Sequence, residues 1–472
     1  MKQQPKRRSP AKKKPLETFQ AEIHQVNDQG VGIDRFQGKE LVIAGVLPGE
    51  QVSFSIEHAG QYRIVGRLQK VLTRSPERIS ARCPQARSCQ GCSLIHWAPA
   101  AQLRFKEDLI RQAATQLDQD QHPEILPIQE ASQPFGYRTN AKLVLGRQRG
   151  RVLLGLYRRG SHDVVDIGDC PLHHPLINKV ATVLRDEITR QNISVYNPAH
   201  HQGLLRYISV RVSPQNQRVL VTFVTRERNY REMTYLAKWL CKKVPEVVAV
   251  HELVNSSTGN VILSGETFKL LGKTDLLDQV GDIQLHIAPT AFFQVNHEQA
   301  GRIYRLVRDW AGLQQDQVAL DLYCGIGGIA LHLAKDAGQI LGIEVVEAAV
   351  RSARRNAQLN GLNNCDFRAG DVAELIQDLG GSSPQVAVIN PPRGGCEESV
   401  LEALIELAPP TLIYVSCNPQ TLFRDLAILV QNGYRAEKLQ PFDMFPQTPH
   451  VESVVRLVRQ STKKTARGGQ KS

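Results

Sequence analysis

The stretch "ALDLYCGIGGIALHLA" (residues 319–334) joins two different hydrophobic patterns through a glycine-rich turn. Its beginning is a short apolar run typical of a buried strand, and its end has the apolar spacing of a helix. Gly325, Gly327 and Gly328 lie in the turn, where the missing side chains let the backbone come close to a ligand. A strand, a glycine turn and a helix in this order predict a ligand-binding α/β unit.

Residues from about 286 onward repeat this alternation of apolar strands and helices. The predicted strands are "VALDLYCG" (318–325), "QILGIEVV" (339–346), "CDFRAGD" (365–371), "QVAVINPPRGG" (385–395) and "TLIYVSCNP" (411–419). The predicted helices lie between them, at 328–337, 347–361 and 399–409. Strands that alternate with helices predict a doubly wound, mostly parallel sheet. We therefore expect an α/β, Rossmann-like domain over residues 286–460.

Residues at the ends of the predicted strands indicate which cofactor this domain binds. Glu344 closes the second strand, 23 residues after Asp321, where a carboxylate can accept hydrogen bonds from both hydroxyls of a ribose. The glycine turn does not match the G-x-x-x-x-G-K-[ST] pattern, which argues against ATP. NAD and S-adenosylmethionine both fit a ribose-binding acid. The fourth strand ends in "NPPR" (390–393), a rigid turn that methyltransferases of this fold place against the substrate, so the sequence favours S-adenosylmethionine.

The segment "IYVSCNPQTLFRDL" (413–426) ends a buried strand on a cysteine and begins a helix at once. A residue at the carboxyl end of such a strand points into the crevice where open α/β sheets bind ligands. We interpret Cys417 as a nucleophile, because a thiolate that adds to carbon-6 of uracil makes carbon-5 an enolate carbon that can accept a methyl group. A free cysteine has a pKa of about 8.5. We expect the dipole of the helix that begins near Gln420 to lower this pKa.

A carboxylate near the end of the chain supplies a candidate base. In "PFDMFPQTPHVESVVRLV" (441–458), Glu452 follows an aromatic, proline-rich loop and precedes an apolar strand. After methyl transfer, the carbon-5 proton has to be removed before the thiol can leave. We assign Glu452 as the general base of this step, with a surface glutamate on a strand as the alternative.

Four other cysteines have the spacing of a metal site. Cys83, Cys89 and Cys92 lie close together, and Cys170 follows in "IGDCPLHH" (167–174). Four thiolates suit tetrahedral zinc or an iron–sulfur cluster. The three-plus-one pattern is less usual for zinc, but the spacing alone leaves both groups open. His173 and His174 are rival ligands by position and are expected at the surface.

The first part of the chain reads as two further segments. Residues 16–74 contain five short predicted strands separated by glycine and proline, which suits an OB-like barrel, a common oligonucleotide-binding shape. Residues 75–285 mix strand and helix patterns and include a predicted hairpin or meander at 137–167. Its basic side chains are Arg138, Lys142, Arg147, Arg149, Arg151, Arg158 and Arg159. Tyr137 and Tyr157 are interleaved with them, which suits RNA binding by backbone contacts and base stacking, although a solvated strand face has the same composition.

The net charge of +12 is concentrated at the two ends. Residues 1–15 contain seven basic residues and residues 461–472 contain four, with no acid in either; the remaining residues include 47 basic and 46 acidic ones. Such tails either solubilise the chain or attract phosphate without sequence preference. No apolar run is long enough to span a bilayer, and no apolar segment follows the basic N-terminus as in a secretory signal. We therefore expect no membrane association and a cytoplasmic location, where the nine cysteines stay reduced.

In its motifs the sequence resembles the RNA 5-methyluridine methyltransferase family. The matching motifs are "FFQVN" (292–296), "DLYCGIGG" (321–328), "GIE" (342–344), "NPPR" (390–393), "SCNPQTLFRDL" (416–426) and "HVES" (450–453). The resemblance spans about residues 16–460 and is greatest to members that methylate uracil carbon-5 in 23S ribosomal RNA. It implies a TRAM barrel at 16–74, a central RNA-binding domain with an iron–sulfur cluster at 75–285 and a methyltransferase domain at 286–460.

The resemblance also implies roles for single residues. Cys417 would be the nucleophile and Glu452 the proton abstractor. A 4Fe–4S cluster, with zinc as the alternative, would be held by Cys83, Cys89, Cys92 and Cys170. S-adenosylmethionine would be bound by Gln294, Tyr323, Gly328, Glu344, Asp371 and Asn390.

The expected partner is RNA, 23S ribosomal RNA in the first place, and we expect a monomer without an obligate protein partner. Methylation of uridine in transfer RNA, methylation of cytidine carbon-5 in RNA, and non-catalytic RNA binding by a metal-cluster protein are the alternatives. A cytidine enzyme places its cysteine directly after the two prolines, where this chain has Arg393, and Cys396 comes three residues later.

Overall fold

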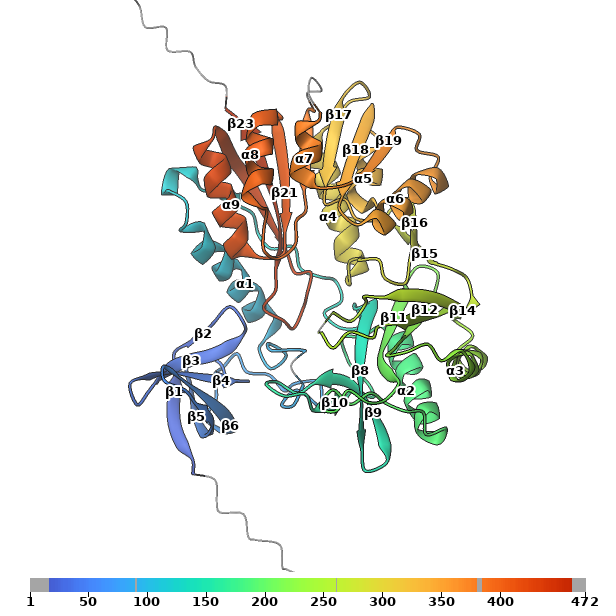
Figure 1. Cartoon of the computed structure of the whole chain (residues 1–472). Helices are drawn as coiled ribbons and strands as arrows, with labels where there is room; N and C mark the ends of the chain where they lie inside the picture. Colours follow the sequence, from blue (N-terminus) through green and yellow to red (C-terminus); the bar gives the residue numbers. More distant parts are fainter. Residues whose placement is uncertain (1–16, 90, 260, 380–383, 461–472) are drawn as a thin grey trace, which may run out of the picture. The chain divides into compact units, whose positions relative to one another are not determined.

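The computed structural model describes residues 17–89, 91–259, 261–379 and 384–460 (Figure 1). The described residues divide into two compact units. The first unit comprises residues up to Ala81 together with Ser93–Ala101, and the second comprises Arg82–Cys92 and the residues from Gln102 onward. Among the described residues, no helix has both the length and the apolar character needed to cross a membrane.

The first unit contains one six-stranded sheet in the order β1-β5-β6-β4-β3-β2. Its strands are β1 (Phe19–Ile23), β2 (Gln25–Val26), β3 (Val31–Phe36), β4 (Lys39–Ala44), β5 (Glu50–Ala59) and β6 (Arg63–Thr73). The predicted β-rich character is confirmed, with the first predicted strand divided at His24. Because β1 and β2 are the two edges of the sheet and only His24 separates them, the sheet has to curl until its edges meet. The curled sheet encloses an apolar core in which Phe54 is fully buried.

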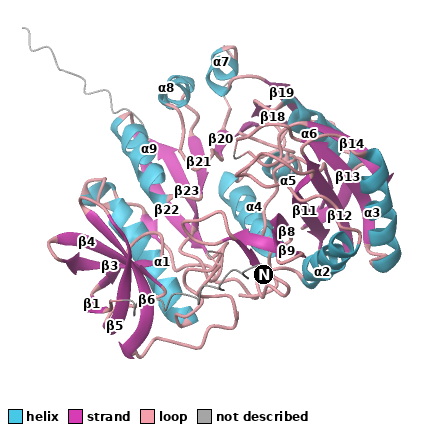
Figure 2. Ribbon diagram, turned by 60° about the horizontal axis from the view of Figure 1, so that its bottom comes forward, coloured by secondary structure: helices cyan, strands magenta, loops and turns pink. Residues whose placement is uncertain are grey.

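A seven-stranded sheet in the second unit has the order β10-β9-β8-β11-β12-β13-β14. Its strands are β8 (Asn140–Gln148), β9 (Arg151–Tyr157), β10 (Val164–Asp166), β11 (Leu205–Ser213), β12 (Arg218–Thr225), β13 (Val247–Val254) and β14 (Glu266–Gly272). The meander predicted at 137–167 is confirmed as β8, β9 and β10. Helices α2 (Pro175–Arg190) and α3 (Tyr230–Lys243) pack their apolar residues against one face of this central sheet (Figure 2).

An eight-stranded sheet follows, in the order β19-β18-β17-β20-β21-β23-β22-β7. Its strands are β7 (Glu124–Ile125), β17 (Val318–Leu322), β18 (Gln339–Glu344), β19 (Cys365–Ala369), β20 (Val386–Ile389), β21 (Thr411–Ser416), β22 (Tyr434–Phe442) and β23 (Glu452–Arg459). The five strands β17 to β21 are parallel, as predicted. β23 lies antiparallel between β21 and β22, which the sequence patterns did not indicate.

Helices cover both faces of the eight-stranded sheet (Figure 1). One face packs against α4 (His297–Ala311), α5 (Gly328–Leu333), α6 (Glu347–Leu359) and the hairpin of β15 (Leu276–Val280) and β16 (Ile283–Ile287). The other face packs against α1 (Pro99–Ala114), α7 (Val372–Gln377), α8 (Glu398–Leu407) and α9 (Pro419–Gln431). α1 thus packs on this sheet and β7 pairs at its edge, although both precede the central sheet in the chain.

The loop between β22 and β23 is held by buried side chains from α1. Lys106 is fully buried and forms an ion pair with Asp443, and its Nζ also donates to the carbonyl oxygen of Phe445 at 3.1 Å. The side-chain amide of Gln102 donates to the side-chain oxygen of Gln447 at 3.1 Å, and the backbone N–H of Gln447 donates to the side-chain oxygen of Gln102 at 3.1 Å. The helix therefore fixes the loop near its beginning and near its middle.

Two further segments hold the same loop. The Asn296 side-chain amide donates to the carbonyl oxygen of Met444 at 3.1 Å, and the Tyr137 hydroxyl donates to that of Pro446 at 3.0 Å. Since Glu452 follows only a few residues later, these bonds determine where the last strand of the sheet begins.

We expect Lys106→Met to lower the free energy of unfolding by about 3–5 kcal/mol, because it leaves the buried Asp443 carboxylate without its partner. Arg111→Met on the exposed side of the same helix is the control and should cost less than about 1 kcal/mol. Urea unfolding at neutral pH measures both. Equal losses for the two variants would contradict the importance of the buried pair.

Candidate active site

Strand register places Cys417 directly beside Glu452. β21 pairs antiparallel with β23, with Ser416 opposite Ser453. Continuing this register by one residue places Cys417 opposite Glu452, and in antiparallel pairs opposite residues lie about 5 Å apart at their Cα atoms. The two residues that the sequence assigned to different catalytic steps are therefore neighbours at one end of the sheet.

Burial and charge change the acidity of both groups. Glu452 is only 3% exposed, and this burial raises its pKa to about 7, against the opposing effect of the Arg393 guanidinium. Burial also raises the pKa of the Cys417 thiol, and the Glu452 carboxylate raises it further. Arg393 lowers the thiol pKa through its charge and a hydrogen bond. Burial and the neighbouring carboxylate together outweigh Arg393, so the thiol pKa is raised, while a contribution from the dipole of α9 stays a prediction.

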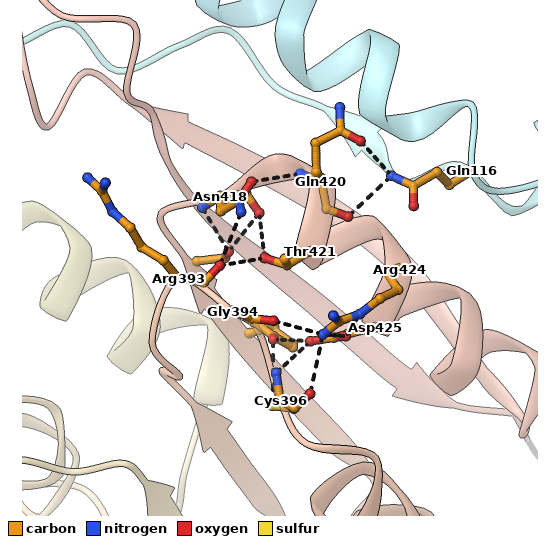
Figure 3. Close-up of polar contacts among 11 residues, drawn as sticks. Gln116, Arg393, Gly394, Cys396, Asn418, Gln420, Thr421, Arg424 and Asp425 are labelled. Atoms are coloured by element: carbon orange, nitrogen blue, oxygen red, sulfur yellow. Dashed lines mark hydrogen bonds and ion pairs between the residues drawn. The ribbon is translucent and has the colours of Figure 1, made fainter. Parts of the chain in front are cut away.

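The backbone around Cys417 is held in a tight turn. The Ser416 hydroxyl accepts a hydrogen bond from the Asn418 N–H at 3.2 Å, and Asn418 caps α9 by accepting from the Gln420 N–H at 3.1 Å. The Asn418 amide and the Thr421 hydroxyl both donate to the carbonyl oxygen of Arg393, at 3.1 and 3.2 Å (Figure 3). The turn that carries Cys417 is thereby tied to the "NPPR" turn.

A buried network behind this turn includes Cys396. Asp425 accepts a hydrogen bond from the backbone N–H of Cys396 at 2.8 Å (Figure 3). It also accepts one from the hydroxyl of Tyr414 at 2.6 Å. Burial raises the pKa of the Cys396 thiol to about 12. Cys396 therefore packs beneath the loop, which does not suit the nucleophile of a cytidine enzyme.

A cavity at the carboxyl ends of β17 and β20 collects most of the predicted cofactor residues. It is lined by Phe292, Phe293, Gln294, Tyr304, Asp321, Tyr323, Cys324, Gly325, Ile326, Gly328, Ile329 and Asn390. Glu344 adjoins it at the end of β18, where its carboxylate accepts hydrogen bonds from the N–H groups of Gly325 at 3.1 Å and Val346 at 2.9 Å. Asp371 lies outside this lining, where it caps α7 by accepting from the Glu374 N–H at 3.1 Å.

The glycine turn is required by its surroundings. Gly327 has φ of +87°, a left-handed conformation that side chains rarely adopt. A Cβ atom on Gly328 would lie 2.9 Å from the hydroxyl of Tyr304. The left-handed backbone at Gly327 and the close approach of Tyr304 to Gly328 explain why both positions are glycine.

Asp321 is a site residue whose role the sequence did not indicate. It is 1% exposed, and burial raises its pKa to about 7. One carboxylate oxygen accepts from the Ala330 N–H at 2.8 Å, while the other has no hydrogen-bond partner among the described residues. The sequence contained one signal for this role, an acidic residue inside the apolar run "VALDL" (318–322).

The four cysteines of the predicted metal group line one small cavity. Cys83, Cys89, Cys92 and Cys170 surround it together with apolar side chains, Arg138 and His173. Burial raises the pKa of Cys89, Cys92 and Cys170, and charge on the neighbouring thiols raises each further. Within the described residues, no set of three or more His, Cys, Asp or Glu side chains converges as a single metal ion requires.

Two expectations about neighbouring residues are wrong. His173 was expected at the surface but is 7% exposed, because it lies in the wall of the cysteine cavity beside Arg138. Tyr137 was expected to stack on bases but is equally buried, because its hydroxyl is used by the loop before Glu452. His174 is half-buried and caps α2, and Tyr157 remains half-exposed.

The doubly wound sheet and the cavity beside its glycine turn suit an enzyme that binds a nucleoside cofactor, and the family to which the chain belongs makes it an S-adenosylmethionine-dependent methyltransferase. Residues 99–460 match the model of the tRNA (uracil-5-)-methyltransferase family. The chain therefore belongs to this family and is an RNA methyltransferase of the uracil-C5 type, as its motifs indicated.

Its relatives cover nearly the whole chain. An uncharacterized RNA methyltransferase of Geobacter sulfurreducens is 43% identical over 93% of this chain and 89% of its own length. One of Clostridium tetani is 33% identical over 95% and 97%. The structure of the Pyrococcus abyssi tRNA (uracil-54, C5)-methyltransferase in complex with S-adenosyl-L-homocysteine is similar with a TM-score of 0.75 and 27% identity, over 93% of this chain and all of that one.

The charges around Cys417 predict how its alkylation depends on pH. Glu452→Gln removes the carboxylate that raises the thiol pKa, so the midpoint of alkylation by iodoacetamide should move down by about one pH unit. Arg393→Gln removes the cation and should move the midpoint up. Mass spectrometry of the peptide that carries Cys417 separates it from the other thiols. Unchanged midpoints in both variants would contradict the described geometry.

Proposed function

We propose that this enzyme methylates carbon-5 of a uridine through a transient bond between Cys417 and carbon-6, with Glu452 as the general base. The observation that carries the proposal is the position of Cys417 opposite Glu452 at the carboxyl end of the sheet, next to the cofactor cavity. In methyl transfer, a nucleophile and a base together suit an acceptor carbon that has to be activated before it can attack the methyl group.

Each residue acts on a defined atom of the substrate. The Cys417 thiolate, stabilised by Arg393, adds to carbon-6 and leaves an enolate whose carbon-5 takes the methyl group. When bound, S-adenosylmethionine would supply that methyl group as an electrophile, with cleavage of its sulfonium–methyl bond and release of S-adenosylhomocysteine. Glu452 then accepts the proton from carbon-5, and the electron pair of that bond re-forms the double bond and expels the Cys417 thiolate. With a pKa of about 7, Glu452 is ionised in a large share of molecules at neutral pH and is still a competent base.

The cofactor would be held by Gln294, Tyr323, Gly328, Glu344, Asp371 and Asn390. Glu344 stands at the end of the second strand of the sheet, as a ribose-binding acid does. Its carboxylate is already oriented by two backbone N–H groups, which leaves lone pairs for the ribose hydroxyls. The backbone of the glycine turn then comes close to the rest of the nucleoside.

We propose 23S ribosomal RNA as the substrate, on the basis of the N-terminal sheet, interpreted as a TRAM barrel, and the cysteine group. Transfer RNA is the second candidate, because the similar Pyrococcus abyssi protein acts on uracil-54 of tRNA. The buried Cys396 weighs against a cytidine substrate. A monomer acting in the cytoplasm is consistent with these assignments.

We further propose that the four cysteines hold a 4Fe–4S cluster, with zinc as the alternative. The donors suit it, because four thiols line one cavity with largely apolar walls, and a cationic group there would counter the raised pKa of Cys89, Cys92 and Cys170. The cluster would cross-link residues 83–92 to Cys170. Tyr137 packs with Cys92 and Cys170 and bonds to Pro446, so the cluster would also support the loop before Glu452.

The covalent step is tested with RNA that contains 5-fluorouridine, because fluorine cannot be removed by the base. With S-adenosylmethionine, 23S ribosomal RNA transcripts should give a denaturation-resistant protein–RNA adduct that Cys417→Ala abolishes and Cys241→Ala retains. Glu452→Gln should accumulate an adduct even with ordinary uridine. An adduct on transfer RNA alone would assign the second candidate, and no adduct on any RNA would reject the mechanism.

The cluster is tested by purification without oxygen. We expect a brown protein with iron and acid-labile sulfide in about equal amounts. Cys83→Ser should lose both, while Cys241→Ser keeps them. A colourless protein with stoichiometric zinc would show that the site holds zinc instead.

A further inference from the structure

The face of the central sheet that α2 and α3 leave uncovered carries tyrosine side chains on β9 and β11. On β11, Ile208 packs against the helices, so Tyr207 points to the other face. Tyr207 pairs with Val144 of β8, and continuing the β8–β9 register by two residues places Tyr157 of β9 opposite Lys142 of β8. Because alternate residues of a strand share a face, Lys142, Tyr157 and Tyr207 lie on the same side of the sheet.

A buried arginine closes the inner side of two tyrosine rings. The guanidinium carbon of Arg206 lies 4.7 Å from the ring centroid of Tyr196 and 5.7 Å from that of Tyr207. The register of β11 with β12 shifts at Arg206, and such a bulge re-aims a side chain. Arg206 is only 4% exposed, and its Nη1 donates to the carbonyl oxygens of Asn255 and Ser257, both at 2.6 Å. Since the cation is buried, the accessible surface of the two rings lies on their other side.

Three tyrosines form one surface, which we call the tyrosine platform: Tyr157, Tyr196 and Tyr207. Each of them is partly exposed. The side chains of Tyr157 and Tyr207 are hydrogen-bonded to each other, and the charge of Arg206 acts on Tyr157 as well. His162 stands edge-on against Tyr157, with 5.4 Å between the ring centroids. Partly exposed aromatic rings that are fixed on a sheet face suit the stacking of unpaired nucleobases.

The hairpin of β15 and β16 packs against a different part of this sheet face. β15 is bonded to the far end of β11, where the Ser213 hydroxyl donates to the Asp278 carboxylate at 2.6 Å. Ser213 is six residues from Tyr207, which is about 20 Å along a strand. The tyrosine platform therefore lies beyond the hairpin, in agreement with its partial exposure.

Exposed cations border the tyrosine platform. Lys142 lies beside it on β8, and Arg158 and Arg159 follow β9 in the chain; all three are exposed. Within the described ranges, the charged groups that act on Lys142 and Arg159 are Arg211 and Cys89, and neither of these is a carboxylate. Cations beside aromatic rings are the combination that binds single-stranded nucleic acid, because the cations attract phosphates and the rings stack on bases.

Strand β11 connects the tyrosine platform with the cofactor cavity. Tyr207 precedes Arg211 by four residues, which is about 14 Å along a strand. The Arg211 Nη2 donates to the carbonyl oxygen of Ala291 at 2.6 Å, and Ala291 directly precedes the cavity residue Phe292. A strand of RNA that presents a uridine to the cavity can therefore place neighbouring nucleotides on the tyrosine platform.

We propose that the tyrosine platform stacks unpaired bases of the RNA near the uridine that is methylated, and that the three bordering cations bind the phosphates of these nucleotides. This inference rests on the RNA substrate of the proposed function. A nucleotide taken out of its stack loses a few kcal/mol, and stacking of its neighbours on the protein offsets that loss. Because every base has a π-face, the tyrosine platform adds affinity without selecting a sequence.

The affinity for short single-stranded RNA tests the tyrosine platform. The Kd of a fluorescein-labelled oligoribonucleotide is measured by anisotropy with the full chain. Tyr157→Leu should weaken binding about 5- to 150-fold, which corresponds to one base stack of roughly 1–3 kcal/mol at about 1.4 kcal/mol per tenfold change. Tyr157→Phe keeps the ring and should keep the parental Kd. Tyr230→Leu is the matched control and should also keep it, because Tyr230 is 59% exposed on α3, which covers the opposite face.

Two further measurements separate stacking from charge. An abasic oligomer of the same length has phosphates but no bases, so the parent and Tyr157→Leu should bind it equally. The slope of log Kd against log KCl should be unchanged in Tyr157→Leu, because stacking releases no counterions. In Lys142→Met the slope should fall by about 0.7, the share of one phosphate contact to a single strand.

Equal Kd values for Tyr157→Leu and Tyr230→Leu would overturn the proposal. A loss of affinity for the abasic oligomer in Tyr157→Leu as large as that for RNA would also overturn it, since the ring would then not act on bases. Should Tyr157→Leu not fold, Tyr196→Leu decides in its place. S-adenosylmethionine affinity, measured by calorimetry, should stay at the parental value. Formation of 5-methyluridine is scored separately: a parent that binds RNA through Tyr157 but forms none would reject the proposed reaction and keep the tyrosine platform.

Discussion

The antiparallel pairing of β21 with β23 is the constraint on which the active site depends. In a parallel sheet, every strand places its carboxyl end at the edge where the ligand binds. Because β23 runs in the opposite direction, its first residue, Glu452, lies at that same edge. A slip of one residue would turn Glu452 to the other side of the sheet, away from Cys417. The buried side chains of β23, including Val454, Val455 and Leu457, oppose such a slip.

The same burial that makes the site chemically useful makes it sensitive to charge. Removing Glu452 from water brings its pKa close to neutrality, but it also makes the Cys417 thiol harder to ionise. Arg393 is the cation that opposes both effects. The reactivity of both Cys417 and Glu452 therefore depends on the exposed guanidinium of Arg393, which is part of the "NPPR" turn.

Local patterns in the sequence were enough to predict the parallel strands, their helices and the residues at the strand ends, because these elements repeat a short-range alternation. Contacts between distant segments were not predictable in this way. β7 has two residues, too few to show a period, and it joins the sheet only through β22. The burial of Tyr137 and His173 depends on a loop and a cavity that the chain forms from segments far apart. The raised thiol pKa of Cys417 depends on its burial and on the position of Glu452, which are long-range features, whereas the helix beside it was visible in the sequence.

The ion pair between Lys106 and Asp443 has a consequence for how the protein is made, because 337 residues separate its partners. At roughly 5–20 residues per second, the ribosome needs some tens of seconds to deliver Asp443 after Lys106 has emerged. During that time α1 has a charged side chain and an apolar face without their final neighbours, and the central sheet can complete its own folding first. Until the last strands are translated, the apolar face of α1 is therefore open to aggregation. Chaperones near the exit tunnel are suited to cover such a face.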